Sequence, residues 1–174
     1  GGGGAGGQGT LAQYPAALAV CAAADAPDTL ACSEASGAGM FTVDLSDTGL
    51  GGAVVHGYLR FENLPPATSI LSATLELVVA DVTNADGDSG QLWEATPFDE
   101  QTPPTPTTAT APLADSQGRV ERGATVSWNV PPTVFGATGL AFFEIRPVTD
   151  VNAAGMLYLD HSSTSPPTLQ LVVR

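Results

Sequence analysis

The segment of residues 57–79, GYLRFENLPPATSILSATLELVV, constrains the fold more than any other part of the chain. Apolar and polar residues alternate in residues 58–61 and again in residues 73–79, so each segment has one apolar face, as in a strand that is buried on one side. Pro65 and Pro66 cannot continue a central strand and indicate a corner between the two segments. This arrangement is typical of an all-β protein.

Similar segments recur between turn-forming residues along the rest of the chain, at a spacing typical of a β-sandwich. We therefore predict an all-β fold, a jelly-roll-like antiparallel β-sandwich with an N-terminal extended arm. In this prediction residues 1–38 form the glycine-rich arm and a disulfide-closed segment, and residues 39–174 form the sandwich domain. The expected strands are residues 40–45, 53–61, 72–80, 91–95, 124–130, 140–146, 155–159 and 168–173.

The charge composition excludes several classes of function. The chain has 174 residues and a net charge of -13, and its 5 basic residues are all arginines. Without lysine the chain cannot form a Schiff base, a P-loop phosphate site or a Lys–Asn isopeptide crosslink. The negative charge disfavours nucleic acid and anionic membrane surfaces as partners. No apolar run approaches the length that spans a bilayer, so we expect no membrane insertion.

Cys21 and Cys32 are the only cysteines of the chain. An even number of cysteines in a chain rich in Gly, Thr and Pro is typical of an oxidised protein, so we predict a disulfide and a secreted, extracellular or cell-surface location. A pair of buried free thiols is the alternative, whereas the spacing is too wide for a CxxC metal knuckle. The bond would stabilise the fold by roughly 2–4 kcal/mol and would pin the N-terminal segment to itself.

The first ten residues, GGGGAGGQGT, offer almost nothing to pack, because glycine has no side chain and loses much entropy on ordering. Such a segment needs a surface that holds it. A neighbouring subunit is the simplest candidate, and folding back on its own domain is the alternative. The chain starts without methionine or a purification tag, as expected for a processed product. The residues expected to form this assembly arm are Gly1, Gly4, Gly7, Leu11 and Tyr14.

Residues 102–112, TPPTPTTATAP, are too rich in proline to enter a sheet and predict an extended surface loop. Threonine together with proline is also typical of O-glycosylated segments, and an unmodified exposed loop is the alternative. No Asn-x-Ser/Thr sequon is present. The candidate acceptors are Thr102, Thr105, Thr107 and Thr108.

Oxygen-bearing side chains cluster around a glycine turn in residues 81–88, DVTNADGD. Calcium prefers oxygen ligands, and Asn84, Asp86 and Asp88 are the expected ligands of a calcium ion at this turn. The spacing matches an EF-hand loop only in part and lacks its closing glutamate. An acidic turn solvated by water is the alternative, and no cofactor is required in either case.

No constellation of catalytic residues emerges from the sequence. The string GDSG at residues 87–90 follows His56 and Asp81 in the order of chymotrypsin-like proteases, but those enzymes hold the histidine and the serine far apart on two barrels. Residues 160–162, DHS, are adjacent, and neighbouring side chains on a strand point to opposite faces. We therefore expect a protein without enzymatic activity.

A platform on which a sugar ring stacks could be supplied by four aromatic residues, Trp93, Trp128, Tyr58 and Tyr158, of which Trp93 and Tyr58 are the candidates for sugar binding. Trp93 has polar and acidic neighbours, which favours an accessible ring. Trp128 alternates in register with Val126 and Val130, so we expect it in the core. Burial in the core is also the alternative for both platform candidates.

Two arginines, Arg60 and Arg146, lie within predicted strands. A guanidinium in the middle of a strand needs a carboxylate partner nearby. The carboxylates that we expect to pair with these arginines are Glu62, Glu76 and Glu144.

The motifs of residues 58–61 (YLRF), 64–65 (LP) and 72–77 (SATLEL) resemble the DNRLRE domains of secreted bacterial and archaeal proteins. Residues 128–130, 140–146 and 165–169 resemble the later strands of that family, so the resemblance covers roughly residues 40–174. It implies a jelly-roll β-sandwich related to carbohydrate-binding modules of polysaccharide-degrading enzymes, some of which bind calcium. Residues 1–38 lack the family's usual opening elements.

These observations together favour a non-enzymatic extracellular structural subunit. We expect it to form a homo-oligomer or polymer, in a filament or surface assembly, in which the N-terminal arm docks on the next copy. The alternative is a carbohydrate-binding module or adhesin that recognises an extracellular polysaccharide.

Overall fold

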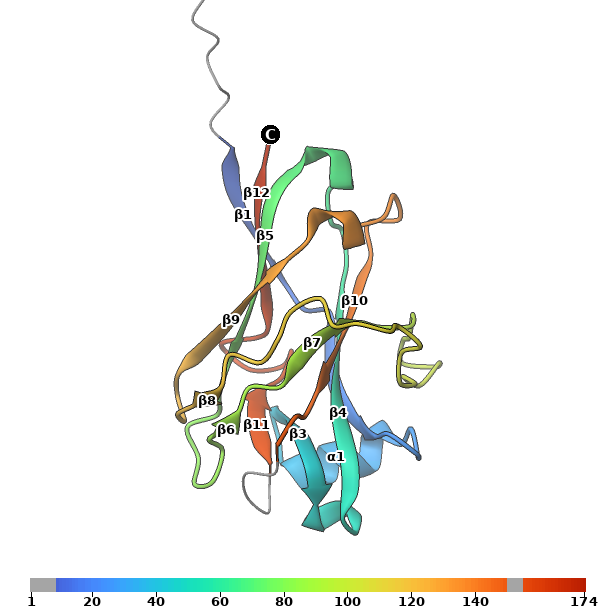
Figure 1. Ribbon diagram of the computed structural model, residues 1–174, viewed down its shortest axis with the longest axis vertical. Coiled ribbons are helices and arrows are strands. Elements are labelled where there is room, and N and C mark those ends of the chain that lie inside the picture. Colours follow the sequence, from blue (N-terminus) through green and yellow to red (C-terminus); the bar gives the residue numbers. More distant parts are fainter. Residues whose placement is uncertain (1–8, 150–154) are drawn as a thin grey trace, which may run out of the picture.

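Two antiparallel β-sheets pack face to face in the computed structural model, which describes residues 9–149 and 155–174 (Figure 1). The predicted fold class, an all-β sandwich with antiparallel sheets, is confirmed. The molecule is elongated along the strands of the first sheet. The described part of the chain contains no helix that is long and apolar enough to cross a membrane.

The first sheet has four strands in the order β1-β12-β5-β9. Every neighbouring pair is antiparallel, and the only irregularity in the pairing falls between Val172 and Val173, where β12 meets β5. The strands are β1 (Thr10–Pro15), β12 (Thr168–Val173), β5 (Ile70–Val78) and β9 (Thr125–Val130).

The second sheet has the strand order β11-β3-β4-β10-β7, with β2 as an additional partner of β4. Residues 57–60 of β4 pair with both β2 and β10, so these two strands lie on opposite edges of β4. The strands are β11 (Met156–Leu159), β3 (Met40–Asp47), β4 (Ala53–Phe61), β10 (Ala141–Arg146), β7 (Gln91–Glu94) and β2 (Leu18–Ala23), and a separate ribbon pairs β6 (Gly87–Asp88) with β8 (Arg119–Val120).

The core lies between the sheets and is filled by alternate residues of their strands. On the first sheet Leu75 and Leu77 of β5 point inward beside Leu169 and Leu171 of β12, and all four are buried. Trp128 of β9 is fully buried in the same core. The prediction that alternation places Trp128 inside is therefore confirmed.

A short helix, α1 (Thr29–Ser36), lies at the end of the molecule opposite the C-terminus (Figure 1). The helix begins where the Asp28 carboxylate accepts a hydrogen bond of 3.0 Å from the N–H of Ala31. It ends at Gly37, whose φ of 91° is favourable only for glycine. Three 3-10 turns complete the fold, η1 (Thr48–Leu50), η2 (Ala67–Ser69) and η3 (Pro132–Val134).

The predicted disulfide is confirmed, because Cys21 and Cys32 are bonded across a Cα–Cα distance of 5.7 Å. Cys21 lies on β2 and Cys32 on α1, and both are buried. The bond therefore fastens the helix to a strand of the second sheet, instead of pinning an independent N-terminal segment to itself.

The separation of residues 1–38 from the sandwich needs correction. Strand β1 pairs with β12 in the first sheet, and β2 pairs with β4 in the second sheet. The chain thus crosses from one sheet to the other between Pro15 and Leu18. Alanines of β2 pack closely against the core, and this burial offsets their low intrinsic preference for strands.

Candidate functional site

The first sheet presents an almost uncharged outer face. Glu76 is the only charged residue within its four strands, although the whole chain has a net charge of -13. The carboxylate of Glu76 accepts hydrogen bonds from Gln170 at 2.5 Å and from the Ser127 hydroxyl at 3.5 Å. The outer face therefore offers neutral hydroxyl and amide groups, which can approach another surface without strong charge repulsion.

Strand β1 lies at one edge of this sheet. All six of its residues pair with β12, and within residues 9–149 and 155–174 it pairs with no second strand. The strand carries no charge, and its Leu11 side chain is 58% exposed. Proteins usually protect edge strands with charges, bulges or a covering segment. An uncharged edge of this kind is suited to pairing with another chain.

The residues predicted for the assembly arm divide into two groups. Leu11 and Tyr14 belong to β1, opposite Val172 and Leu169, so at this point the chain folds back on its own domain. This outcome corresponds to the alternative that the sequence left open. The remaining arm residues, Gly1, Gly4 and Gly7, lie outside the described residues, and their docking on another copy stays a prediction.

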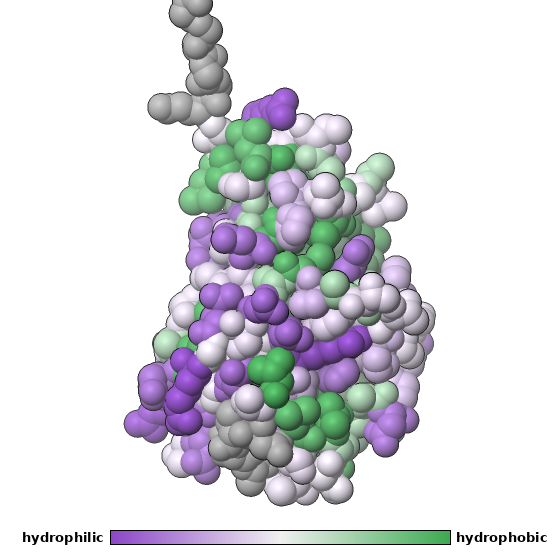
Figure 2. Space-filling model, viewed as in Figure 1, coloured by the Kyte–Doolittle hydropathy of each residue, from purple (hydrophilic) through white to green (hydrophobic). Residues whose placement is uncertain are grey.

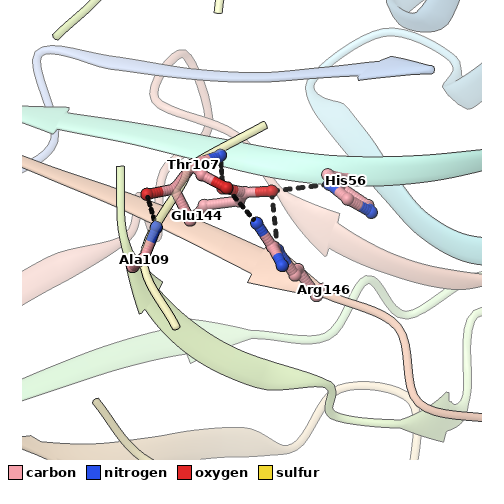
Figure 3. A network of polar contacts seen from close by, with 5 residues as sticks. All are labelled: His56, Thr107, Ala109, Glu144 and Arg146. Atoms are coloured by element: carbon pink, nitrogen blue, oxygen red, sulfur yellow. Dashed lines mark hydrogen bonds and ion pairs between the residues drawn. The ribbon is translucent and has the colours of Figure 1, made fainter. Parts of the chain in front are cut away.

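A buried polar cluster occupies the second sheet, on neighbouring strands β4 and β10 (Figure 3). The Glu144 carboxylate lies 2.6 Å from Nδ1 of His56 and accepts a hydrogen bond of 3.0 Å from Nε of Arg146. Its second oxygen accepts a hydrogen bond of 2.7 Å from the N–H of Thr107. The Arg146 guanidinium also donates to the Thr107 carbonyl at 2.8 Å. Both oxygens of Glu144 are therefore occupied, and the cluster fastens the proline-rich loop to the sheet.

Neighbouring hydrogen-bond donors stabilise the ionised form of Glu144. Burial alone would raise the pKa of this carboxyl, because desolvation disfavours the ionised form. The hydrogen bonds from His56, Arg146 and the Thr107 N–H outweigh burial, so the pKa lies below its ordinary value. A carboxylate fixed in this way is a poor proton donor near neutral pH, and the cluster is suited to holding structure.

The sequence indicated only part of this cluster. Arg146 was expected to pair with a strand carboxylate, and its pairing with Glu144 is confirmed, as is that of Arg60 with Glu62. The role of His56 was missed, because it lies 88 residues from Glu144 and only the adjacent positions of β4 and β10 bring the two together.

The prediction that Tyr58 forms a sugar platform is wrong. Its side chain is fully buried and packs edge-on against Phe98, at 5.9 Å between ring centroids. Burial, and secondarily the nearby Glu144 charge, raises the pKa of the Tyr58 hydroxyl. A ring without exposed surface cannot stack on a sugar. The position failed as a prediction because both faces of β4 are covered at this point.

Trp93 on β7 is half-buried. The Arg146 guanidinium lies 4.3 Å from the centroid of its ring, which is the geometry of a cation–π contact. One face of the indole is therefore occupied by a side chain of the polar cluster. A sugar could use only the remaining face, and this role of Trp93 stays a prediction.

The proline-rich loop of residues 102–112 contains no regular secondary structure, as expected. Thr102, Thr105 and Thr108 are exposed, whereas Thr107 is half-buried and its hydroxyl accepts a hydrogen bond from the N–H of Ala109. The accessible threonines keep their predicted role as O-glycosylation acceptors, and Thr107 acts instead in fastening the loop.

The residues predicted to bind calcium have protein partners. Asp86 pairs with Arg119, and Asp88 accepts hydrogen bonds from the Ser116 hydroxyl at 2.6 Å and from the Gly90 N–H at 2.9 Å. Asn84 adopts a positive φ of 61° at the turn. In the described ranges, His, Cys, Asp and Glu form no group of three that could hold a metal ion. Calcium at this turn stays a prediction.

The protease-like residues do not converge. His56 contacts Glu144, Asp81 pairs with Arg122, and the Ser89 hydroxyl accepts a hydrogen bond of 2.7 Å from the Gln117 N–H. Ser162 donates both its N–H and its hydroxyl to Asp160 within one turn. None of these contacts joins a histidine to a serine.

Comparison with known proteins adds no relative to this picture, because no protein-family model and no curated protein matches the chain. The resemblance to the DNRLRE domain consequently rests on the quoted motifs alone.

Proposed function

We propose that the chain is a non-enzymatic structural subunit of an extracellular assembly, which associates with further copies through its N-terminal segment and the edge strand β1. One observation carries this proposal: β1 is an uncharged edge strand with a single partner strand in the described part of the chain. The four strands of its sheet contain one charged residue in total. The glycine-rich residues that precede β1 could extend along another copy, since backbone pairing needs no particular side chains.

The location is supported by the disulfide. A disulfide such as that between Cys21 and Cys32 persists in oxidising compartments and is rare in the reducing cytosol.

The neutral outer face of the first sheet supports the assembly of copies. Copies with a net charge of -13 repel one another unless they meet at surfaces of low charge.

Electron microscopy and analytical ultracentrifugation of the full chain test the proposal. We expect filaments or larger assemblies whose population rises with protein concentration. Deletion of residues 1–8 leaves β1 in place and is expected to reduce assembly, because it removes only the segment that precedes the strand. A full chain that stays monomeric at every concentration would overturn the proposal.

A single added charge gives a sharper test of the edge. Gln13 is exposed on β1, and Gln13→Lys places a charge where a second strand would pair. Gln101 is exposed in the loop between β7 and β8, where its neighbour Glu100 contacts Arg60 of β4, so Gln101→Lys makes the same substitution away from β1. We expect the first variant to weaken assembly and the second to assemble like the unmodified chain. Equal assembly of both variants would exclude β1 as the contact.

A further inference from the structure

The end of the molecule at which β1 begins carries an exposed apolar patch, formed by Leu11, Leu71 and Val172. Leu11 is 58% exposed and Leu71 is 43% exposed, and Leu11 lies directly opposite Val172 in the pairing of β1 with β12. Gly9 lies between Leu71 and Val172, because a Cβ on this glycine would come within 2.9 Å of Leu71 and 2.4 Å of Val172. Figure 2 shows hydrophobic surface gathered at this end of the molecule.

An arginine without an ion-pair partner among the described residues lies beside this apolar patch. The Arg174 N–H donates a hydrogen bond of 3.0 Å to the Ser69 carbonyl, which places Arg174 beside η2 and the start of β5. Its side chain is exposed, and Arg174 is the one arginine that forms no ion pair within the described ranges. No acidic residue occurs in the segments that build this end, residues 9–12, 63–72, 131–140 and 172–174.

The opposite end of the molecule carries a hollow of about 510 Å³ between the start of α1 and the turn that joins β3 to β4. Alanines and glycines form much of its wall, together with the carboxylates of Asp25 and Asp28. Asp28 caps α1, whereas Asp25 is exposed and makes no hydrogen bond or ion pair within residues 9–149 and 155–174. Leu30 on α1 lines an adjoining hollow and is 68% exposed.

The two ends are complementary. Each has exposed leucine, one has an unpaired guanidinium, and the other has an unpaired carboxylate beside small residues that leave room for larger side chains. Two copies that met by their acidic ends would bring like charges together, as would two copies that met by their Arg174 ends. The head-to-tail orientation alone brings opposite charges into contact.

We propose that the end of one copy that bears Leu11, Leu71 and Arg174 binds the α1 end of a second copy. In this contact the leucines occupy the alanine- and glycine-lined hollow beside Leu30, and Arg174 faces Asp25. A contact between different surfaces of identical subunits is heterologous and repeats without closing, so it produces a filament. The inference rests on the proposed function and specifies which surfaces of the subunit meet.

Charge reversal tests the contact. Arg174→Asp and Asp25→Arg are each expected to raise the dissociation constant of the assembly, on the order of tenfold. The double variant restores opposite charges and is expected to recover most of the lost affinity. The control is Arg122→Asp, which changes the net charge as Arg174→Asp does but acts on the exposed pair with Asp81 at another position. Sedimentation velocity measures all four variants against the unmodified chain.

The apolar part is tested with Leu30→Ser, which removes an exposed leucine and leaves the core unchanged. Weaker assembly of this variant supports the contact. If Arg174→Asp and Leu30→Ser both assemble like the unmodified chain while deletion of residues 1–8 abolishes assembly, the head-to-tail contact is wrong and the proposed function stands. If the unmodified chain never assembles, both are overturned.

Discussion

The backbone N–H of Thr107 donates a hydrogen bond of 2.7 Å to the buried carboxylate of Glu144, which lies 37 residues later on β10. Arg146 donates to the carbonyl of the same threonine at 2.8 Å. Both backbone groups of Thr107 are thus held by β10 side chains. The proline-rich loop is therefore fastened to the second sheet near its middle, although it contributes no strand to either sheet.

Replacement of Glu144 by glutamine should destabilise the protein strongly. The variant Glu144→Gln leaves His56 and Arg146 without their shared carboxylate, and breaking a buried pair of this kind costs about 3 kcal/mol of unfolding free energy. Urea denaturation measures the change. The matched control, Glu121→Gln, alters an exposed carboxylate 4.0 Å from Arg119 and should change the free energy by about 0.5 kcal/mol or less. A similar stability of both variants would contradict a structural role of the cluster.

The same cluster predicts how stability depends on acid pH. The pKa of Glu144 is lower in the folded protein than its ordinary value of 4.5, so its contribution to stability is complete above that value. The contribution is lost as the pH falls from about 4.5 through the lowered pKa, because the unfolded chain then binds the proton more readily. Denaturation curves between pH 6 and pH 3, values chosen to bracket the ordinary glutamate pKa, should show a steeper decline for the unmodified protein than for Glu144→Gln. Parallel declines would indicate that other carboxylates dominate.

Loss of the hydroxyl group should change the stability of the protein in opposite directions at two fully buried tyrosines. The Tyr158 hydroxyl donates a hydrogen bond of 2.8 Å to the Ser89 carbonyl, whereas the Tyr58 hydroxyl has no partner within the described residues. Tyr158→Phe should destabilise by about 1 kcal/mol, because it leaves a buried carbonyl unpaired. Tyr58→Phe should be neutral or stabilise by about 1 kcal/mol, because it removes an unsatisfied polar group. Thermal unfolding compares the two, and equal destabilisation would refute the distinction.

Reduction of the disulfide should lower stability without unfolding the sandwich. The bond joins cysteines 11 residues apart, and closing a loop of this size in the unfolded chain is worth about 3 kcal/mol. The melting temperature should therefore fall when dithiothreitol is added. The variant Cys21→Ala/Cys32→Ala provides the control, because the chain has no other cysteine on which the reductant could act. A melting temperature unaffected by dithiothreitol in the unmodified protein would contradict this prediction.

Alternation of apolar and polar residues was sufficient to predict the sandwich. Strands β4 and β12 match their predicted bounds, and the other predicted strands differ from the structure by two residues or fewer at each end. These segments are rich in β-branched and aromatic residues, whose inward-facing members fill the core. The pattern is strong because it follows from burial of one face.

The N-terminal strands could not be predicted in the same way. β1 reads TLAQYP and β2 reads LAVCAA, with few residues that favour strands. Their conformation depends on β12 and β4, which supply backbone partners from distant parts of the chain. The helix α1 had one local signal, the carboxylate of Asp28 three residues before Ala31, but the segment is short and surrounded by alanines. Tertiary contacts therefore determine the conformation of these three elements.

The pairing of β1 with β12 has a consequence for biosynthesis. Thr10 lies opposite Val173, so the first described strand finds its place in the sheet only after nearly all of the described chain has been made. Until then β12, which lies between β1 and β5, is missing from the first sheet. Because such distant pairings form slowly, newly made chains should remain incompletely folded for some time. That delay would postpone completion of the first sheet until β12 has been made and has paired with β1.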